Sequence, residues 1–332
     1  MILFFLVALC LLLLLGNRYK CIYYRRGSER WSVGISRVKS LNNISNKADK
    51  VLSHQFIKES SGMDFAADPF LLKKDGRYYL FVEAAINEFG RLDVYSSSDL
   101  ERWEHEGIAL SKDIHLSYPQ VFWYNDKVYM IPETKSYREV GLYESIDFPL
   151  KWEKKRVLLK GKFVDTTILF YENSVYLFGY NSGVLECYVS NDLLSGEFKE
   201  HPFSPLGIGN KMRPGGTIFI KDDKIIIPVQ SRTKGYGYAL YSVVVKELTP
   251  DKIRYRKGGA LLKPDSKSEY FKEGEHTLSI LKEDDGYVVA IDGRSGIHKA
   301  YWRNNCSKAW DDFKNDVRTF FIILKNNYRR NA

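Results

Sequence analysis

Cysteine is scarce in this 332-residue chain, with four residues at positions 10, 21, 187 and 306. Neither their spacing nor their density suits a zinc module or a disulfide-rich secreted domain. Proline (10) and methionine (4) are also few, whereas tyrosine (23) and phenylalanine (19) are plentiful. This balance favours β-strands over helical bundles, and an apolar fraction of 44% suffices for a folded core. We therefore expect an all-β body with reduced thiols.

A concentrated basic patch is also missing, although the formal net charge is +9. The basic residues are spread along the chain, and no helix-turn-helix, zinc-finger or RNA-binding motif occurs. We therefore expect no nucleic-acid partner. The positive charge instead suits the phosphate of a nucleotide sugar or an anionic lipid surface.

One long apolar run opens the chain, at residues 1–16. It has no basic residue before it and no small-x-small cleavage pattern after it. It is shorter than the ~20 residues that span a bilayer comfortably, but residues 21–24 would extend it at the interface, and basic and aromatic residues follow up to Arg26. We expect an uncleaved membrane anchor and basic flank in residues 1–26, with the body on the cytoplasmic face. A signal peptide with export is the alternative.

An internal repeat occupies most of the chain. Five segments each contain an apolar strand, a polar turn and a second strand, at residues 67–83, 117–133, 164–180, 212–230 and 275–292. The turns carry the Asp, Asn and Gly residues of tight hairpins. A further turn and an outer aromatic residue would complete blades of roughly 45 to 50 residues.

This repeat predicts a five-bladed β-propeller over residues 27–300, with residues 30–38 pairing with the last blade to close the ring. A β-sandwich is the alternative, but it would not repeat the same hairpin. Residues 301–332 differ in character, because apolar residues recur there at helical spacing with basic residues between them. They predict an amphipathic helix that packs on the propeller edge or lies on an anionic membrane.

The innermost strand of each propeller blade lines the central axis, so equivalent positions form rings. One predicted ring, at the start of the first strand of each repeat, contains Asp68, Tyr118, Asp165, Arg213 and His276. A second ring, at the end of the second strand, contains Glu83, Glu133, Tyr180, Gln230 and Asp292. Polar groups in such apolar segments indicate a site, although pairing across the axis, or waters or an ion filling it, would also explain them.

Paired carboxylates are the groups that glycosidic chemistry uses, one as acid and the other as base or nucleophile. We expect Asp68, Asp165 and Glu133 to be catalytic. The residues expected to bind substrate are Glu83, Tyr118, Arg213, Gln230, His276 and Asp292. A divalent cation would find oxygen ligands at Asp68 and Asp165, but no loop has the spacing of a dedicated site, and no metal or cofactor is predicted.

Several motifs resemble those of known sugar-active propellers. Asp68-Pro69-Phe70 and Phe163-Val164-Asp165-Thr166-Thr167 are similar to motifs of the five-bladed superfamily of family-43 glycoside hydrolases, invertases and levansucrases. A more specific set of motifs adds to these two Ser117-Tyr118-Pro119, Ile131-Pro132-Glu133-Thr134, Arg213-Pro214-Gly215-Gly216 and Gly235-Tyr236-Gly237. Together they resemble the N-terminal propeller domain of plant glucosamine inositolphosphorylceramide transferases and its bacterial relatives, from about Trp31 to Asp292.

The family-43 resemblance implies that Asp68 is a general base and that Asp165 tunes the pKa of a glutamic acid in the fourth blade. Arg213 stands where that acid is expected, and arginine cannot donate a proton at neutral pH although it binds phosphate well. Any general acid would have to be Glu83, Glu133 or Glu275.

We therefore expect a membrane-anchored protein of cell-surface polysaccharide or glycolipid assembly, which binds a sugar or sugar phosphate and works beside other glycan-assembly enzymes. One alternative is a family-43-like hydrolase acting on furanosides. The other is a non-catalytic glycan-binding propeller, because the resemblance to the plant transferases covers their propeller only.

Overall fold

The computed structural model describes residues 22–26, 29–44, 48–86, 89–209, 211–232, 235–296 and 300–304, and positions 313, 317 and 321. The chain divides into two compact units. One unit is residues 30–295, and the other combines residues 1–29 with residues 296–332.

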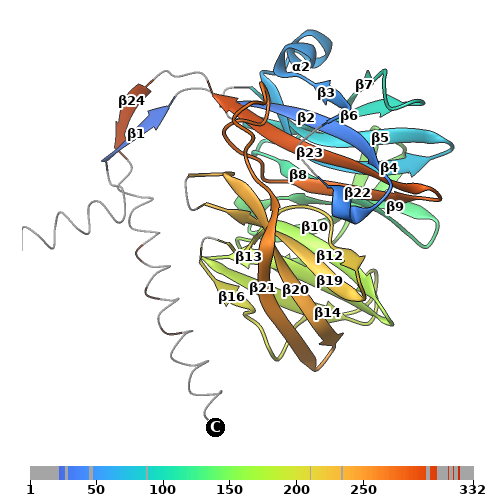
Figure 1. The fold of residues 1–332 in the computed structure, drawn as a ribbon. Helices are drawn as coiled ribbons and strands as arrows, with labels where there is room; N and C mark the ends of the chain where they lie inside the picture. The colour runs from blue at the N-terminus through green and yellow to red at the C-terminus, as the bar shows by residue number, and fades with distance from the viewer. Residues whose placement is uncertain are drawn as a thin grey trace, which may run out of the picture. The chain divides into compact units, whose positions relative to one another are not determined.

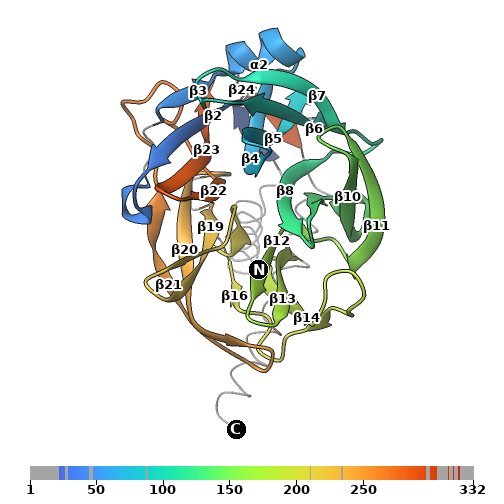
Figure 2. The same cartoon turned by 90° about the vertical axis from the view of Figure 1, so that its right-hand side faces the viewer.

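Residues 30–295 form five antiparallel sheets arranged as blades around a central axis (Figures 1 and 2). The first blade consists of β4 (Phe65–Lys74), β5 (Arg77–Ile86), β6 (Phe89–Ser97) and β7 (Glu104–Leu110). The second consists of β8 (Ser117–Tyr124), β9 (Lys127–Glu133), β10 (Glu139–Asp147) and β11 (Lys151–Lys160). Each blade begins with the hairpin that the repeat predicted.

The third and fourth blades keep this order with short additional strands. The third blade consists of β12 (Val164–Tyr171), β13 (Ser174–Asn181), β14 (Val184–Ser190), β15 (Lys199–Glu200) and β16 (Gly207–Ile208). The fourth consists of β17 (Arg213–Pro214), β18 (Phe219–Lys221), β19 (Lys224–Ser231), β20 (Ala239–Thr249) and β21 (Lys252–Leu262). The innermost strand of the fourth blade is thus divided into β17 and β18, which both pair with β19.

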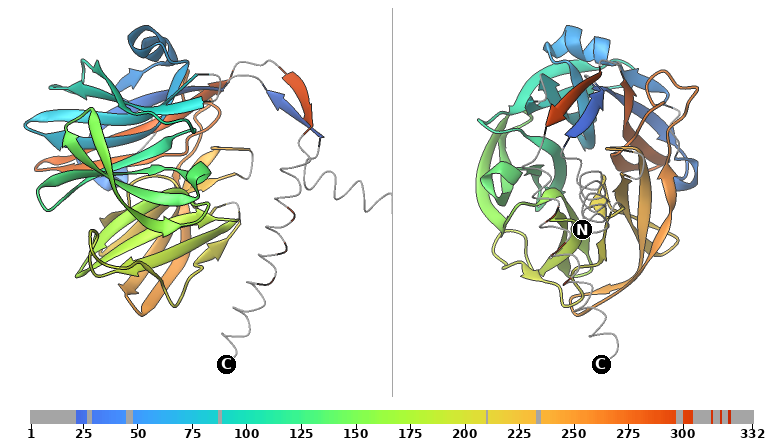
Figure 3. Two further views of the ribbon diagram at one scale, coloured as in Figure 1. Left: turned by 180° about the vertical axis from the view of Figure 1, so that it is seen from behind. Right: turned by 90° about the vertical axis from the view of Figure 1, so that its left-hand side faces the viewer.

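The fifth blade joins the two ends of residues 30–295. Its strands are β22 (Leu278–Glu283), β23 (Gly286–Gly296), β2 (Glu29–Val38) and β3 (Lys50–Leu52). The ring is therefore closed by N-terminal strands, as the sequence predicted for residues 30–38 (Figure 3). Short helices lie in the connections, namely η1 (Leu41–Asn43), α2 (His54–Ser61) and η2 (Lys135–Tyr137).

The core consists of apolar clusters between neighbouring blades. Between the fifth and first blades, for example, Val33, Leu80 and Val288 are all fully buried in one cluster. Equivalent clusters lie between each following pair of blades. Because every blade is covered on both faces, its strands are apolar on both sides, and polar side chains in the inner strands stand out.

In the second unit, β1 (Ile22–Arg26) pairs antiparallel with β24 (Ala300–Asn304), with Ile22 opposite Asn304. The prediction of a helix from residue 301 is therefore wrong for residues 301–304, because aromatic residues such as Tyr301 and Trp302 favour strands. Residues 22–26, assigned to the anchor and its flank, are likewise a strand.

The predicted anchor in residues 1–21 and most of the predicted C-terminal helix lie outside the described residues. Positions 313, 317 and 321 are helical. Within the part of the chain that the structure describes, no helix is both long and apolar enough to cross a membrane.

Candidate functional site

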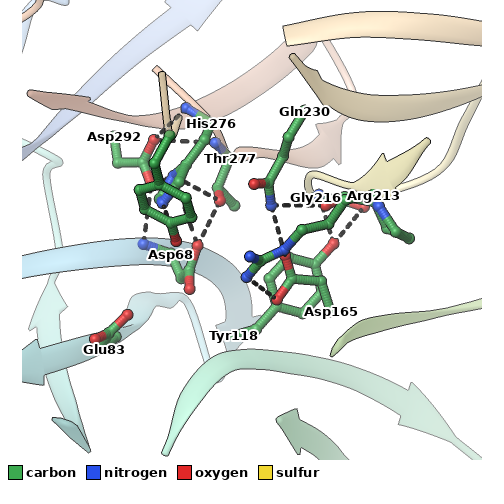
Figure 4. Close-up of polar contacts among 12 residues, drawn as sticks. Asp68, Glu83, Tyr118, Asp165, Arg213, Gly216, Gln230, His276, Thr277 and Asp292 are labelled. Carbon is green, nitrogen blue, oxygen red and sulfur yellow. Dashed lines mark hydrogen bonds and ion pairs between the residues drawn. The ribbon is translucent and has the colours of Figure 1, made fainter. Parts of the chain in front are cut away.

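Three blades present a polar residue at the axis by the same backbone feature. Asp68, Tyr118 and Asp165 have φ angles of 49°, 51° and 49°. The pairing of the first two strands also shifts register at each of these positions. Bulges turn a side chain out of its regular direction, and a positive φ in a non-glycine residue is a strain that often marks functional positions. Figure 4 shows these three side chains within one polar cluster.

The fourth and fifth blades reach the cluster differently. Arg213 lies in β17 directly opposite Gln230 of β19. His276 precedes β22, and it is Thr277 whose carbonyl accepts the amide of Asp292, at 3.4 Å. The sequence alignment of His276 with Asp68 is therefore one residue out of structural register, although the two side chains still meet.

The second predicted ring is brought together except at one position. The other four residues all belong to the axial cluster. The side chains of Glu83 and Glu133 are 11% exposed, and Gln230 and Asp292 are fully buried. Tyr180 instead packs against the apolar cluster between the third and fourth blades.

Asp292 is the centre of the first half of the site. Its Oδ1 accepts the backbone amides of His276 (2.9 Å) and Thr277 (3.0 Å), and its Oδ2 accepts the amide of Asp68 (3.0 Å). The Oδ2 atom is also 2.6 Å from His276 Nδ1. This carboxylate thus fixes the backbone of two blades and the imidazole orientation together.

The charges of this pair support each other. Burial alone would raise the pKa of Asp292, but the imidazole and the amide donors of His276 outweigh it and lower that pKa. Burial would likewise lower the pKa of His276, but the carboxylates of Asp292 and Asp68 outweigh it and raise that pKa. We therefore expect an imidazolium–carboxylate pair at the axis.

Asp68 differs from Asp292 in having an oxygen left for a ligand. Its Oδ1 accepts the hydroxyl of Thr277 at 2.6 Å and lies 3.8 Å from His276 Nδ1. Among the described residues, no hydrogen bond reaches its Oδ2. Burial, opposed by the charge of His276, raises the pKa of Asp68 to about 6. Asp68 is therefore suited to accept a proton near neutral pH.

Asp165 and Arg213 form the second half of the site. Arg213 Nε donates to Asp165 Oδ2 (2.5 Å) and Nη2 donates to Oδ1 (3.0 Å), a bidentate pair. Gln230 Nε2 also donates to Asp165 Oδ2, and to the carbonyl of Pro214 at 2.8 Å. Both oxygens of Asp165 are therefore occupied, an arrangement that suits a residue positioning Arg213 better than a nucleophile or acid.

Tyr118 is fully buried, and its hydroxyl is satisfied within the protein. The hydroxyl accepts the amide of Gly216 (2.6 Å) and bonds Thr167 Oγ1 (2.7 Å). A side chain added at Gly216 would lie 1.9 Å from the carbonyl oxygen of Leu278, so only glycine fits there. In this geometry Tyr118 positions the segment after Arg213, and its predicted contact with substrate stays a prediction.

Three buried glutamates hold their protons more tightly than usual. Burial, with the nearby Asp165 carboxylate, raises the pKa of Glu133 to about 8. Burial and the neighbouring carboxylates, Asp68 foremost, raise the pKa of Glu83 well above its usual value. Burial, with the Asp292 carboxylate, raises the pKa of Glu275 to about 9. Glu133 and Glu275 are therefore neutral at pH 7, and Glu133 Oε2 lies 3.8 Å from Arg213 Nη2.

Glu275 provides a test of this charge state. Its residue is fully buried, and neither carboxyl oxygen has a hydrogen-bond partner among the described residues. The pKa of this carboxyl group is about 9 in the folded chain and 4.5 in the unfolded chain. Between these two pH values the folded chain holds a proton that the unfolded chain has released. The stability from this group is thus complete below pH 4.5 and is lost as the pH rises toward 9.

We predict that Glu275→Gln, which is always neutral, removes this loss. Relative to wild type, its free energy of unfolding should increase by on the order of 1 kcal/mol per pH unit between pH 5 and 8, measured by urea unfolding. The exposed Glu101→Gln serves as the control and should show no such trend. If the difference in free energy of unfolding between Glu275→Gln and wild type did not change with pH, Glu275 would be ionised in the folded protein.

One group of side chains has the atoms to hold a metal ion. Ligand atoms of Asp68, His276 and Asp292 all lie within 4.8 Å of one another, and no other such group of three occurs in the described part of the chain. His276 Nδ1 is already 2.6 Å from Asp292 Oδ2, a hydrogen bond that needs the Nδ1 proton. A metal at Nδ1 would therefore have to displace that proton.

A surface groove of about 320 Å³ lies elsewhere, lined by residues 156–160 and by Ser195, Glu197 and Phe198. Arg156 there donates to the carbonyls of Leu194 and Gly196, which is a structural role. The groove contains none of the strained, buried or paired titratable groups described above. The chemistry therefore places the candidate site at the axis.

The sequence did not single out Tyr236, Trp31 or Thr277 as site residues. Trp31 stacks on the imidazole of His276 with ring centroids 4.2 Å apart, and Tyr236 OH lies 3.2 Å from His276 Nε2. The glycines on both sides of Tyr236 were the available signal, because they indicate a loop held close to other backbone. Trp31 comes from β2, so only ring closure brings it to the site.

Comparison with known proteins agrees with this architecture. Residues 39–294 match the family described as glucosamine inositolphosphorylceramide transferase 1, N-terminal. Over 205 residues the chain is 32% identical to glucosamine inositolphosphorylceramide transferase 1 of Arabidopsis thaliana and 31% identical to that of Oryza sativa subsp. japonica. Each match covers 58% of this chain and 27% of the relative, so the chain spans about a quarter of the length of these relatives.

Solved structures share the fold at low sequence identity. The catalytic domain of the GH62 α-L-arabinofuranosidase of Coprinopsis cinerea has a TM-score of 0.56 and 12% identity, covering 81% of this chain and 98% of its own. β-1,2-Mannobiose phosphorylase of Listeria innocua has a TM-score of 0.54 and 12% identity, covering 70% and 89%. A thermostable family-43 glycoside hydrolase has a TM-score of 0.51 and 18% identity, covering 70% and 90%. With most of its length matched, the chain belongs to the family of the N-terminal domain of glucosamine inositolphosphorylceramide transferase 1.

Proposed function

We propose that the axial site binds a phosphate-activated sugar and supports glycosyl transfer from it, in the assembly of a cell-surface polysaccharide or glycolipid. The names of the relatives support a sugar substrate, since the matched family is named for a transferase and the structural neighbours include arabinofuranosidases and a phosphorylase. The chemistry of the site supports the choice of donor.

The observation that carries this proposal is the state of Arg213. Its bidentate pair with Asp165 uses two of its five N–H donors and fixes the guanidinium in place. Among the described residues, no hydrogen bond involves its Nη1, and the side chain is 15% exposed. A pre-oriented guanidinium with remaining donors is a well-suited phosphate ligand, and a nearby imidazolium adds to it.

Asp68 completes the proposed reaction as the base. The carboxylate oxygen of Asp68 that has no hydrogen-bond partner would take the proton of an acceptor hydroxyl. At the same time the oxygen of that hydroxyl forms a bond to the anomeric carbon. The bond to the phosphate oxygen breaks, and its electron pair leaves with the phosphate. Phosphate is a good leaving group, so its charge needs stabilisation by cations more than it needs a strong acid.

One observation favours hydrolysis as the second candidate. Glu133, with its pKa raised to about 8, is protonated at neutral pH and would act as the acid that a glycosidic oxygen requires. Under this reading, neutral furanosides would be substrates. A non-catalytic glycan-binding role would need neither proton donor nor base.

The proposal includes association with a membrane through residues 1–26, with the propeller on the cytoplasmic side. It rests on the apolar run and its basic flank. Protease digestion of sealed spheroplasts tests it, because a cytoplasmic propeller would be protected until the membrane is opened. Digestion in intact spheroplasts would support export and, with it, the hydrolase reading.

A binding panel tests the substrate class. The full chain, kept in mild detergent, is titrated calorimetrically with UDP-N-acetylglucosamine and other nucleotide sugars, with sugar 1-phosphates and with neutral oligosaccharides such as cellotriose. We expect heat from at least one phosphate-bearing ligand and none from the neutral series. Binding of neutral oligosaccharides alone would contradict the proposal and favour hydrolysis or passive recognition.

The pH dependence tests Asp68 as the base. With the donor found by the panel, turnover should rise as the pH increases through about 6, because Asp68 must lose its proton before it can accept one. Asp68→Asn should lower turnover by roughly 10²- to 10⁴-fold without weakening donor binding to the same extent. If Asp68→Asn were as active as wild type, Asp68 would not be the base.

A further inference from the structure

Tyr236 is the most accessible aromatic group of the axial site. It is 36% exposed, whereas the side chains of His276 and Asp68 are 2% and 3% exposed. Its ring also lies 5.5 Å from the guanidinium carbon of Arg213. Tyr236 therefore stands between the two halves of the site, where a ligand approaching Arg213 would meet it.

The hydroxyl of Tyr236 is connected to a buried carboxylate through one imidazole. Asp292 Oδ2 lies 2.6 Å from His276 Nδ1, and His276 Nε2 lies 3.2 Å from Tyr236 OH. Trp31 holds the imidazole plane by stacking at an angle of 17°. Both ring nitrogens of His276 are thus used, one toward the interior and one toward the accessible phenol.

Glycine residues fix the loop that carries Tyr236. Gly237 has a φ of +59°, and a Cβ atom there would lie 2.8 Å from Trp31 and 3.0 Å from His276. A Cβ atom at Gly274 would lie 2.3 Å from the carbonyl oxygen of Gly237. The loop can therefore approach the imidazole this closely only with glycine at both positions.

We propose that Tyr236 is a catalytic residue, which passes a proton from His276 to the oxygen that leaves the sugar. The relay runs from Asp292 through His276 to Tyr236. The buried carboxylate orients the imidazole, and the imidazole exchanges a proton with the accessible hydroxyl. The inference deepens the proposed function and rests on it for the identity of the substrate.

The transfer step balances with the groups present. As the bond between the anomeric carbon and the leaving oxygen breaks, its electron pair stays on that oxygen, which takes the proton of Tyr236. The phenol oxygen takes the Nε2 proton of His276, and Asp68 takes the proton of the acceptor hydroxyl. His276 loses one proton and Asp68 gains one, and exchange with solvent restores both. Arg213 faces the negative charge of the departing phosphate.

Chemical labelling tests the relay without a substrate. The full chain is treated with an arylsulfonyl fluoride at mildly alkaline pH, and the modified tyrosines are mapped by mass spectrometry. Tyr137 is the matched control, because it is similarly exposed, at 40%, but its hydroxyl donates to the carboxylate of Asp113. Burial raises the pKa of the Tyr236 phenol, but the charged Nε2–H group of His276 would stabilise its phenolate. We therefore expect Tyr236 to react at least about tenfold faster than Tyr137.

Two variants complete the test. His276→Gln should reduce the rate at Tyr236 to that at Tyr137. Tyr236→Phe, which removes one atom from a partly exposed residue, should change the ¹⁵N resonance of His276 Nε2 while leaving that of Nδ1 in place. The resonance measurement on Tyr236→Phe tests the relay even if His276→Gln does not fold.

The outcomes separate the relay from the proposed function. Rapid labelling that depends on His276, without turnover of UDP-N-acetylglucosamine or any other donor, would keep the relay and refute the substrate assignment. Equal labelling of Tyr236 and Tyr137, or an unchanged Nε2 resonance in Tyr236→Phe, would overturn the relay. With an active donor, Tyr236→Phe should lower turnover by roughly 10²- to 10⁴-fold while donor affinity changes much less.

Discussion

Asp292→Asn is expected to lower the free energy of unfolding by about 3 to 5 kcal/mol, because it breaks a buried ion pair and leaves His276 without its partner. The oxygen and nitrogen of an asparagine side chain cannot together accept the amides of His276, Thr277 and Asp68 as well as the imidazole Nδ1 proton. Equilibrium unfolding in urea at pH 7 measures the change.

Glu283→Gln is the matched control for Asp292→Asn. Glu283 also accepts from several groups, including Lys73 and Arg37, but it lies in a network whose cations are 41% and 58% exposed. Such partly exposed pairs contribute only about 0 to 1 kcal/mol each. Equal and small losses for the two variants would show that Asp292 is not the centre around which the first and fifth blades are fixed.

Arg213→Met combined with Asp165→Asn is expected to abolish phosphate-dependent binding with little loss of the fold. Removing Arg213 alone would leave Asp165 as an unpaired buried charge, and an unfolded variant would say nothing about ligands. The double variant removes both charges together. Loss of charged hydrogen bonds to a phosphate should weaken binding by roughly 10- to 150-fold for each bond, measured by the same calorimetric titration.

The single variant Arg213→Lys provides the comparison at constant charge. Lysine keeps a positive charge but cannot form the planar bidentate pair with Asp165, so we expect weakened phosphate binding with partial retention. Asp165→Asn alone should leave Arg213 charged but less firmly oriented. If the double variant bound nucleotide sugars as tightly as wild type, phosphate recognition at Arg213 would be excluded.

The blades and most of the rings could be predicted from the sequence because both follow from local repetition. The hairpins place one residue of each blade at the same distance from the turn. Each of these residues is the seventh after a two-residue turn, so the alignment of Glu83, Glu133, Gln230 and Asp292 was correct. The first ring was harder to align. Bulges at Asp68 and Asp165, and the division of the inner strand of the fourth blade into β17 and β18, change the number of residues between the ring position and the turn by one or two.

The pairing within the site could not be read from the alignment. Sequence spacing placed Asp165 and Arg213 in one ring, but only their distances reveal that they neutralise each other. Tyr236 is in a loop, where no periodicity assigns a direction to a side chain. The strand at residues 300–304 was missed because its pairing partner, residues 22–26, lies almost 280 residues earlier in the chain.

The central claim is that a sugar phosphate binds between Arg213 and the relay that ends at Tyr236. A crystal structure of the chain with UDP-N-acetylglucosamine, or with whichever donor the panel identifies, tests it most directly. The account predicts a phosphate oxygen within hydrogen-bonding distance of Arg213 Nη1 and of the Tyr236 hydroxyl, with the sugar toward Asp68. A donor bound away from the axis, or an axis occupied by a cation held by Asp68, His276 and Asp292, would contradict it.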